Sequence, residues 1–422
     1  AAAADVEVDP VARRKSLSAL YGKKLATLQR GDYFGEKALL ADDVRQASCI
    51  AVGKVVCLSL SRDDFSAMLG SWDQGAEDGG GSGAEGGGGM GVSHIPDVNE
   101  SQVRFTLELD LEELESLSVL GEGAFGKVKL VRHRTTGKEY ALKAQAKGFI
   151  ASQGMQKMVL NELRIMRMIN HPCIAKLYCA MQDKKYIYFL LELLPGGEFF
   201  NFLQGAGKLT EEKTRFYSAA VVMALGELHR CKIAYRDLKP ENMVLDAKGF
   251  VKLVDLGLAK QIMSGNTWTM CGTPDYLAPE IILNKGHDMA VDLWALGVLI
   301  YEMVHGWPPF YNDDPMKVYA KIISGKINYP DSFSTSMEDV IAKLCTKNPS
   351  KRLGNMKGGI ADLVKHKWFG AFDWKGLRKG SIVPPFVPKV SPSSPGSSGG
   401  GPVDDPGEQD NVEDSDWVVD MA

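Results

Sequence analysis

A glycine-rich run in the first quarter of the chain limits what the whole sequence can fold into. Ten of the seventeen residues from 75 to 91 are glycine, in the sequence GAEDGGGSGAEGGGGMG. Such a segment cannot bury enough apolar surface to offset the entropy lost on ordering it, so it predicts a flexible linker. We expect the linker over residues 75–104, and the chain must then fold as at least two separate parts.

The end of the chain has a second biased composition. Residues 391–401 read SPSSPGSSGGG, and seven acidic residues with no basic one follow between Asp404 and Asp416. This composition predicts an acidic segment without a core of its own. The apolar cluster WVVDM that follows is either a docking anchor, which we favour, or a plain chain end.

Charge and composition argue against several classes of partner. The chain has 49 basic and 53 acidic residues and a formal net charge of -4, so no broad positive field predicts binding to nucleic acid or to an anionic membrane. No apolar run reaches the roughly 18 residues of a membrane span. The seven cysteines form no CxxC pair, which predicts reduced thiols, no zinc site and a cytoplasmic protein.

Because the sequence begins with Ala rather than Met, we expect that its true N-terminus is missing.

The region from about 105 to 370 changes its hydrophobic periodicity part-way along. Its first part has strand patterns separated by turn signals, namely LSVLGEGAFGKVKLVRH, EYALKAQ and YIYFLLELL. Its second part has the helical patterns EEKTRFYSAAVVMALGELH and MAVDLWALGVLIYEMVHG. This order predicts an α+β fold with a small β-rich lobe followed by a larger helical lobe.

A series of short motifs runs through the same region. GEGAFGKV has the spacing GxGxxGxV, which by itself also occurs in simple glycine turns. Lys143 in YALK comes fifteen residues after Val128, and Glu162 lies in the helical pattern NELRIMRM. The motifs YRDLKPEN, DLG and APE follow in that order. Each motif is weak alone, but the ordered set makes coincidence negligible.

The ordered set resembles that of the protein kinases, which transfer the γ-phosphoryl group of ATP mainly by positioning and charge stabilisation. The resemblance implies that Asp237 is the base that faces the acceptor hydroxyl and that Lys239 neutralises the γ-phosphate. It also implies that Lys143, positioned by Glu162, holds the α- and β-phosphates.

The same resemblance implies an ATP site and a metal site. Asn242 and Asp255 would bind Mg²⁺ through hard oxygen atoms. The residues expected around ATP are Leu120, Gly121, Glu122, Gly123, Ala124, Phe125, Gly126, Lys127, Val128, Ala141, Lys143, Leu191, Glu192, Leu194, Glu198 and Val244. Leu256 stands where the family template has Phe, and we expect this change to cost about 1 kcal/mol of packing without removing a catalytic atom.

Longer matches narrow the resemblance to one group of kinases. YRDLKPEN with Tyr235, NTWTMCGTPDYLAPEIILNKGHD and the tail HKWFGAFDWKGLRKG followed by WVVDM are similar to the AGC group, and within it to the cGMP-dependent kinases. This implies a bilobal kinase domain over 105–369 and a C-terminal tail over 370–422 that wraps back onto the small lobe. It also implies that Thr269 is the activation-loop phosphosite, with Arg236 and Lys260 as cationic partners.

The resemblance to this group of kinases also implies a substrate preference. Glu198, Glu241 and Glu302 match carboxylates that receive arginine side chains, so we expect protein substrates with Arg two and three residues before Ser or Thr. The residues before Thr269, QIMSGNTW, contain no Arg or Lys, which indicates a separate upstream kinase. Ordinary packing explains Cys271 better than redox regulation does.

The N-terminal part contains a second candidate phosphate site. FGEKALL, DVRQA and VVCLSLSRDDFSAML resemble the phosphate-binding cassette of cyclic-nucleotide-binding domains. By that match Arg45 would pair with the cyclic phosphate, backbone amides around Gly35 would assist, and Glu36 would hold the ribose hydroxyl. Gln46 stands where relatives that select cGMP have Thr or Ser, so cGMP and cAMP are both candidates.

Residues 1–74 cover only about the latter half of such a domain, so we expect a partial β-barrel. We predict a Ser/Thr protein kinase that uses ATP and Mg²⁺ and is regulated by a cyclic nucleotide, with cGMP favoured. Three alternatives stay open. They are an unregulated kinase, a pseudokinase scaffold, and a cyclic-nucleotide sensor as the main function, with the kinase joined to it across the linker by an error in the gene model. The motif RRKSL matches the expected substrate preference and makes Ser16 a candidate for self-phosphorylation.

Overall fold

The structure is a computed structural model that describes residues 109–123, 126–389 and Trp417. The chain divides into two compact units, residues 1–92 and 93–422, and all of the described residues belong to the second unit. The candidate nucleotide residues Gly35, Glu36 and Arg45 and the candidate phosphosite Ser16 therefore lie outside the described residues.

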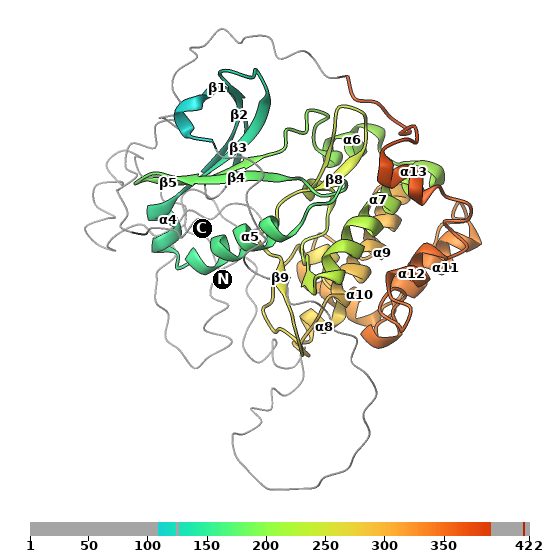
Figure 1. Cartoon of the computed structure of the whole chain (residues 1–422). Coiled ribbons are helices and arrows are strands. Elements are labelled where there is room, and N and C mark those ends of the chain that lie inside the picture. The colour runs from blue at the N-terminus through green and yellow to red at the C-terminus, as the bar shows by residue number, and fades with distance from the viewer. Residues whose placement is uncertain (1–108, 124–125, 390–416, 418–422) are drawn as a thin grey trace, which may run out of the picture. The chain divides into compact units, whose positions relative to one another are not determined.

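The small lobe is built around one antiparallel sheet of five strands in the order β1-β2-β3-β5-β4 (Figure 1). A short 3₁₀ turn, η2 (Leu111–Glu113), precedes the first strand. The strands are β1 (Leu114–Gly123), β2 (Gly126–His133), β3 (Glu139–Ala146), β4 (Leu177–Gln182) and β5 (Tyr186–Leu191). The predicted strand patterns are confirmed, except that in the run ending at residue 194 the strand stops at Leu191, and the next N–H, that of Glu192, donates to the Lys176 carbonyl at 2.9 Å.

The two faces of this sheet are covered differently, because side chains alternate along each strand. On β3, Tyr140, Leu142 and Ala144 join a small apolar cluster with Leu190 of β5. The opposite side packs into the main core, where helices α4 (Lys147–Ser152) and α5 (Gln156–Met168) contribute Ile150, Val159 and Leu163. Lys143, which alternates with Leu142 and Ala144, therefore lies on the α5 side of the sheet.

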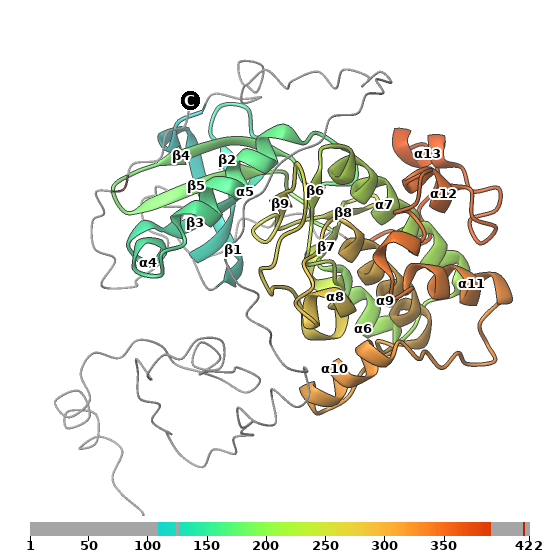
Figure 2. The same ribbon diagram turned by 90° about the horizontal axis from the view of Figure 1, so that it is seen from below.

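The larger lobe is helical and contains the long predicted helices. The 20-residue α7 (Glu211–Arg230) begins at Thr210, whose side chain accepts a hydrogen bond from the Lys213 N–H. The other α-helices are α6 (Phe199–Ala206), α8 (Pro279–Ile282), α9 (Ala290–His305), α10 (Pro315–Ser324), α11 (Thr335–Leu344), α12 (Ile360–Val364) and α13 (Trp374–Lys379) (Figures 1 and 2). The buried α9 packs against α7 and α11, so it forms the centre of this lobe.

Short strands and 3₁₀ turns lie between the helices where the two lobes meet. The strands are β6 (Ile233–Ala234), β7 (Met243–Leu245), β8 (Val251–Leu253) and β9 (Lys260–Gln261), and the turns are η3 (Pro240–Asn242), η4 (Pro274–Tyr276) and η5 (Pro349–Lys351). Strand β6 pairs with β9, and β7 pairs with β8. These two ladders hold the loops that contain YRDLKPEN and DLG, and the predicted bilobal α+β fold is confirmed.

The described part of the tail packs on the larger lobe. The ring of Phe386 stacks on Phe202 of α6 with centroids 4.5 Å apart. A Cβ added at Gly249 would lie 1.8 Å from the Phe386 carbonyl oxygen, so the tail crosses directly over that glycine. Trp417, in the WVVDM cluster, is half-buried and packs against the main core, which supports the docking-anchor interpretation. Within the described residues, every helix is too short or too polar to cross a bilayer.

Candidate active site

Strand β3 and helix α5 bring together a lysine and a glutamate from the predicted set. The Nζ of Lys143 donates to Oε1 of Glu162 at 2.7 Å and lies 3.9 Å from Oδ1 of Asp255. Burial alone would lower the pKa of Lys143, but the charges of Glu162 and Asp255 outweigh it and leave that pKa raised. Lys143 is therefore a fixed cation where the two lobes meet.

The carboxylate of Asp237 is held by three side chains. Its Oδ2 accepts a hydrogen bond from Nδ2 of Asn242 at 2.7 Å and lies 3.0 Å from Nζ of Lys239. Its Oδ1 accepts a hydrogen bond from the hydroxyl of Thr273 at 3.0 Å, and Lys239 also donates to that hydroxyl at 3.0 Å. The network gives the carboxylate one orientation, as a general base requires.

Asp292 is a residue that the sequence reasoning missed, and it anchors the loop before Asp237. Its carboxylate accepts hydrogen bonds from the backbone N–H groups of Tyr235 and Arg236 at 2.9 and 2.8 Å, and it pairs with Nε2 of His229 at 2.8 Å. Arg236 has a left-handed φ of 68°, which the two hydrogen bonds stabilise. A charged residue inside the otherwise apolar stretch MAVDLWALG was the available signal.

The two predicted metal ligands lie on adjacent backbone segments. The N–H of Val254 donates to the carbonyl of Asn242 at 3.0 Å, which places Asp255 directly beside Asn242. Asp255 has a φ of 55°, and its Oδ1 accepts the N–H of Gly257 at 3.0 Å. Because Asn242 uses Nδ2 to reach Asp237, its Oδ1 is the atom that can bind a cation. Carboxylate and amide oxygens of this kind suit Mg²⁺.

The residue between Asp255 and Gly257 is buried in the apolar core. Leu256 is 2% exposed and belongs to the main core. Its side chain therefore fills the apolar position where the family template has Phe, in agreement with the expectation that no catalytic atom is lost.

The glycine-rich hairpin joins β1 to β2 above Lys143. Gly126 has a φ of 155°, and a Cβ there would lie 1.8 Å from the carbonyl oxygen of Ala144 on β3. Only glycine fits so close to the neighbouring strand. Ala124 and Phe125 lie outside the described residues, and the side chain of Glu122 is likewise not described.

The remaining predicted ATP residues come from both lobes. Ala141 of β3 is paired with Leu191 of β5, and Val244 forms an isolated bridge with Glu198. The Glu192 carboxylate is bound by Nζ of Lys252 at 2.6 Å, and its backbone N–H donates to the Lys176 carbonyl at 2.9 Å, so its backbone carbonyl is the group that a ligand could use. The others are exposed or half-buried: Leu120, Gly121, Lys127, Val128 and Leu194.

The structure does not bring the predicted phosphosite Thr269 to Lys260. Thr269 is exposed, while Nζ of Lys260 donates at 2.8 Å to the hydroxyl of the buried Thr267. Arg236 uses Nε to reach the Leu258 carbonyl at 2.8 Å. Burial raises the pKa of the half-buried Cys271 thiol, which agrees with an unreactive packing role.

The three predicted substrate carboxylates have different environments. Glu198, at the start of α6, and Glu241 are exposed. Glu302 of α9 is 7% exposed and accepts a hydrogen bond from the hydroxyl of Tyr276. Burial raises the pKa of Glu302 to about 7, against the Tyr276 hydrogen bond and with further contributions from Glu241 and Asp275. Asp275 and Tyr276 were not foreseen, although both lie in the quoted CGTPDY run.

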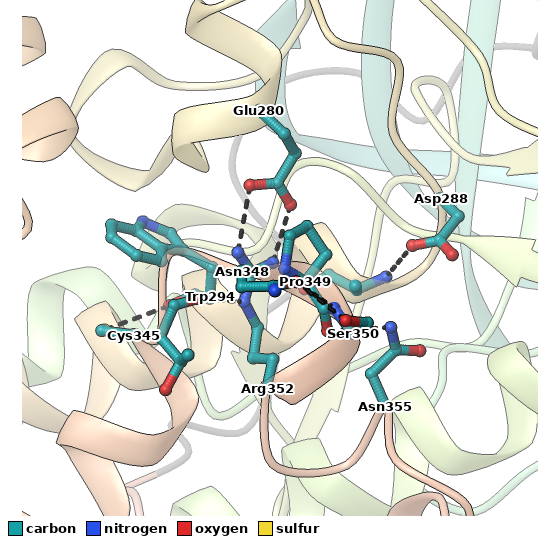
Figure 3. Close-up of polar contacts among 11 residues, drawn as sticks. Glu280, Asp288, Trp294, Cys345, Asn348, Pro349, Ser350, Arg352 and Asn355 are labelled. Atoms are coloured by element: carbon teal, nitrogen blue, oxygen red, sulfur yellow. Dashed lines mark hydrogen bonds and ion pairs between the residues drawn. The ribbon is translucent and has the colours of Figure 1, made fainter.

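We define the activation segment as residues 260–272, and a buried ion pair holds the APE motif that follows it. Arg352 is fully buried and donates to both carboxylate oxygens of Glu280, at 2.7 and 3.0 Å (Figure 3). It also donates to the Ala290 carbonyl at the start of α9, and its guanidinium lies 5.4 Å from the ring centroid of Trp294. The pair therefore ties α8 to α9 beneath the site.

Comparison with known proteins adds two domain matches. The model of the family "Protein kinase domain" matches residues 114–369. The model of the family "Cyclic nucleotide-binding domain" matches residues 17–71. The first covers more than half of the chain, and the second covers the segment in which the sequence predicted a cyclic-nucleotide cassette.

Curated proteins similar to this chain come from several animals. It is 41% identical over 389 residues to cGMP-dependent protein kinase 2 of Rattus norvegicus, covering 87% of this chain and 51% of that protein. It is 43% identical over 376 residues to cGMP-dependent protein kinase, isozyme 1, of Drosophila melanogaster, covering 87% and 49%. The cGMP-dependent protein kinase egl-4 of Caenorhabditis elegans is 41% identical over 376 residues, covering 87% and 48%. The chain thus spans about half the length of these relatives.

Proposed function

We propose that this chain, which belongs to the protein kinase family, phosphorylates Ser and Thr side chains of proteins under the control of a cyclic nucleotide. The observation that carries the proposal is the carboxylate of Asp237, which Asn242, Lys239 and Thr273 hold in one orientation. A base fixed in this way suits the acceptance of a proton from an acceptor hydroxyl.

The residues present fit ATP and Mg²⁺, the cofactors that a kinase domain implies. Gly126 lets the β1–β2 hairpin lie against β3 without a side chain in the way, and Asn242 and Asp255 offer oxygen atoms from adjacent segments. Bound MgATP would supply the phosphoryl group and the metal charge that offsets its negative oxygens. Lys143, oriented by Glu162, would bind the α- and β-phosphates.

The loop around Asp237 would position the acceptor hydroxyl. Asp237 would orient the substrate hydroxyl and take its proton, while Lys239, which already bridges Asp237 and Thr273, would face the transferred phosphoryl group. Because Asp292 holds the backbone of this loop, its geometry exists before substrate binds.

The substrate preference that we propose is Arg two and three residues before Ser or Thr. Glu198, Glu241 and Glu302 would receive the guanidinium groups. The charges of Glu241 and Asp275 raise the pKa of Glu302, so Glu241, Asp275 and Glu302 lie in one neighbourhood. We further propose that Thr269 is phosphorylated by a separate upstream kinase, since no basic residue precedes it in QIMSGNTW.

For regulation, we propose binding of a cyclic nucleotide through Gly35, Glu36 and Arg45. The domain match to residues 17–71 supports a cyclic nucleotide, and the similarity to cGMP-dependent protein kinases favours cGMP, while Gln46 keeps cAMP as the second candidate. We propose that the chain divides into a partial nucleotide domain (1–74), a linker (75–104), a kinase domain (105–369) and a tail (370–422).

The five cysteines of the described part are free thiols, which supports our proposal of a cytoplasmic location.

The test is phosphate transfer from MgATP to an Arg-Arg-Lys-Ser-Leu peptide by the intact chain, with and without cGMP and cAMP. We expect transfer that one nucleotide stimulates. Transfer that neither nucleotide changes would refute the regulation but keep the kinase. Absence of transfer to any Ser or Thr peptide by a chain phosphorylated at Thr269 would favour the pseudokinase scaffold instead.

A further inference from the structure

Two buried side-chain nitrogens behind the activation segment have no hydrogen-bond partner among the residues that the structure describes. They are Nη1 of Arg236 and Nε2 of His287. His287 is only 3% exposed, and the charge of Arg236 is close enough to lower the pKa of the His287 ring. Unpaired buried polar nitrogens are costly and rare, so two of them in one neighbourhood indicate a hydrogen-bond partner that binds in another state of the protein.

His287 lies directly behind the segment that contains Thr269. Its backbone exchanges two hydrogen bonds with Thr267, at 2.9 and 2.8 Å. A Cβ added at the preceding Gly286 would lie 2.9 Å from Nε1 of Trp268. The pair 286–287 therefore supports residues 267 and 268, immediately before the exposed Thr269.

Nearby carboxylates do not pair with Nε2 of His287, and each accepts hydrogen bonds from other groups. Three of them influence the pKa of His287. The donors to Asp292 are the backbone N–H groups of Tyr235 and Arg236. Arg352 donates to Glu280, and the backbone N–H of Ala290 donates to Asp288; Figure 3 labels both carboxylates. The acceptor for His287 must come from elsewhere.

The charge state of His287 suits an anionic ligand that arrives later. Burial lowers the pKa of His287 to about 4, with a further lowering by Arg236, so the ring is neutral at neutral pH. A neutral ring adds a donor beside Arg236 without adding a like charge, and its proton can sit on either nitrogen to suit the partner. A phosphate monoester brings nearly two negative charges and three acceptor oxygens.

We propose that His287 is a further ligand of the phosphate on Thr269, donating from Nε2 while Arg236 donates from Nη1. The inference rests on the proposed function, because it requires Thr269 to be the phosphosite. His287 is then a positioning residue: it holds the phosphorylated activation segment against the backbone that it already pairs with at Thr267.

The test compares the full chain with two variants, all prepared with phosphate on Thr269 and followed by mass spectrometry during incubation with a non-specific phosphatase. His287→Phe keeps a ring but removes the donor, and His287→Gln keeps an amide donor in a similar place. We expect phosphate loss from His287→Phe to be about fivefold faster than from the wild-type chain, the factor expected for one ordinary hydrogen bond. His287→Gln should lose phosphate at nearly the wild-type rate.

Thermal unfolding of the unphosphorylated chains supplies the second measurement. His287→Phe removes an unpaired buried polar nitrogen, so its midpoint should equal or exceed that of the wild-type chain. Equal rates of phosphate loss in all three chains would overturn the role of His287 and leave Thr269 as the phosphosite. An equally faster loss in both variants, with lowered midpoints, would mean that His287 only supports the fold, which would also overturn the proposal. An active wild-type chain without phosphate on Thr269 would overturn the phosphosite itself.

Discussion

At the scale of single residues, the candidate site depends on contacts of very different sequence separation. Lys239 and Asn242 reach Asp237 from two and five residues away, within one loop, and the YRDLKPEN motif predicts both. Thr273 reaches the same carboxylate from 36 residues away, and nothing in its local sequence indicates that contact. Residues placed by one motif were thus predictable, whereas a partner brought in by the fold was not.

Replacing Thr273 by Val tests whether that hydroxyl orients the base. The substitution keeps the branched shape but removes the donor to Asp237 Oδ1 and the acceptor for Lys239. We expect kcat to fall about tenfold, the effect of losing one hydrogen bond to a charged group, with a smaller change in the KM for ATP. Steady-state kinetics with a basic peptide measures both. Thr346→Val, at an exposed helix end, is the matched control, and an unchanged kcat in Thr273→Val would contradict the role.

The raised pKa of Glu302 predicts a pH-dependent substrate affinity. Because that pKa is about 7, the carboxyl group is mostly neutral below pH 7 and becomes charged above it. Only the charged form pairs strongly with a guanidinium, so the KM for an arginine-containing peptide should fall as the pH rises from about 6 to about 8. Kinetics across this range checks it. Glu302→Gln should give a high KM at every pH, and a wild-type KM that stays flat would show that Glu302 does not bind the arginine.

At the scale of elements, the spacing of glycines in GEGAFGKV is explained by how closely β2 approaches β3. Gly126 faces Gln145 in the register of the two strands, and its Cβ position is occupied by the backbone of Ala144. The hairpin was predictable from its pattern, but the reason for glycine at this position was not, because the obstacle lies on a strand that the motif does not contain.

Replacing Gly126 by Ala should separate β2 locally from β3. The added methyl group would meet the Ala144 carbonyl, and we expect the free energy of unfolding to fall by about 2 kcal/mol and the KM for ATP to rise. Urea denaturation and ATP titration measure the two effects. Gly205→Ala in α6 is the control, since its methyl group meets nothing within 4 Å and should be neutral or stabilising. Similar stabilities for the two variants would refute the packing argument.

At the scale of the whole molecule, a buried ion pair joins segments of the large lobe that are far apart in the chain. Arg352 lies 72 residues from Glu280 in the chain, yet its guanidinium is fully buried against that carboxylate and the start of α9 (Figure 3). The APE motif marked Glu280, but no pattern in the sequence indicated Arg352 as its partner.

Replacing only Arg352 of this ion pair should lower the stability of the protein. Arg352→Met leaves the Glu280 carboxylate buried without its partner, and we expect the free energy of unfolding to fall by about 3 to 5 kcal/mol. The double variant with Glu280→Leu should recover part of the loss, because no unpaired charge then remains. Urea denaturation of the two variants and the wild-type chain provides the comparison, and a double variant no more stable than Arg352→Met would contradict the explanation.

The amino-acid order by itself determined the family, the bilobal α+β fold and the identity of the residues around Asp237, because those residues are close together in short motifs of fixed spacing. Only the tertiary structure decided that Thr273 and Asp292 hold the catalytic loop, that Glu302 is buried beside Tyr276, and that His287 lies behind the activation segment. The physical reason is that hydrogen bonding, burial and the resulting pKa depend on which distant segments pack together, and local patterns do not specify that packing.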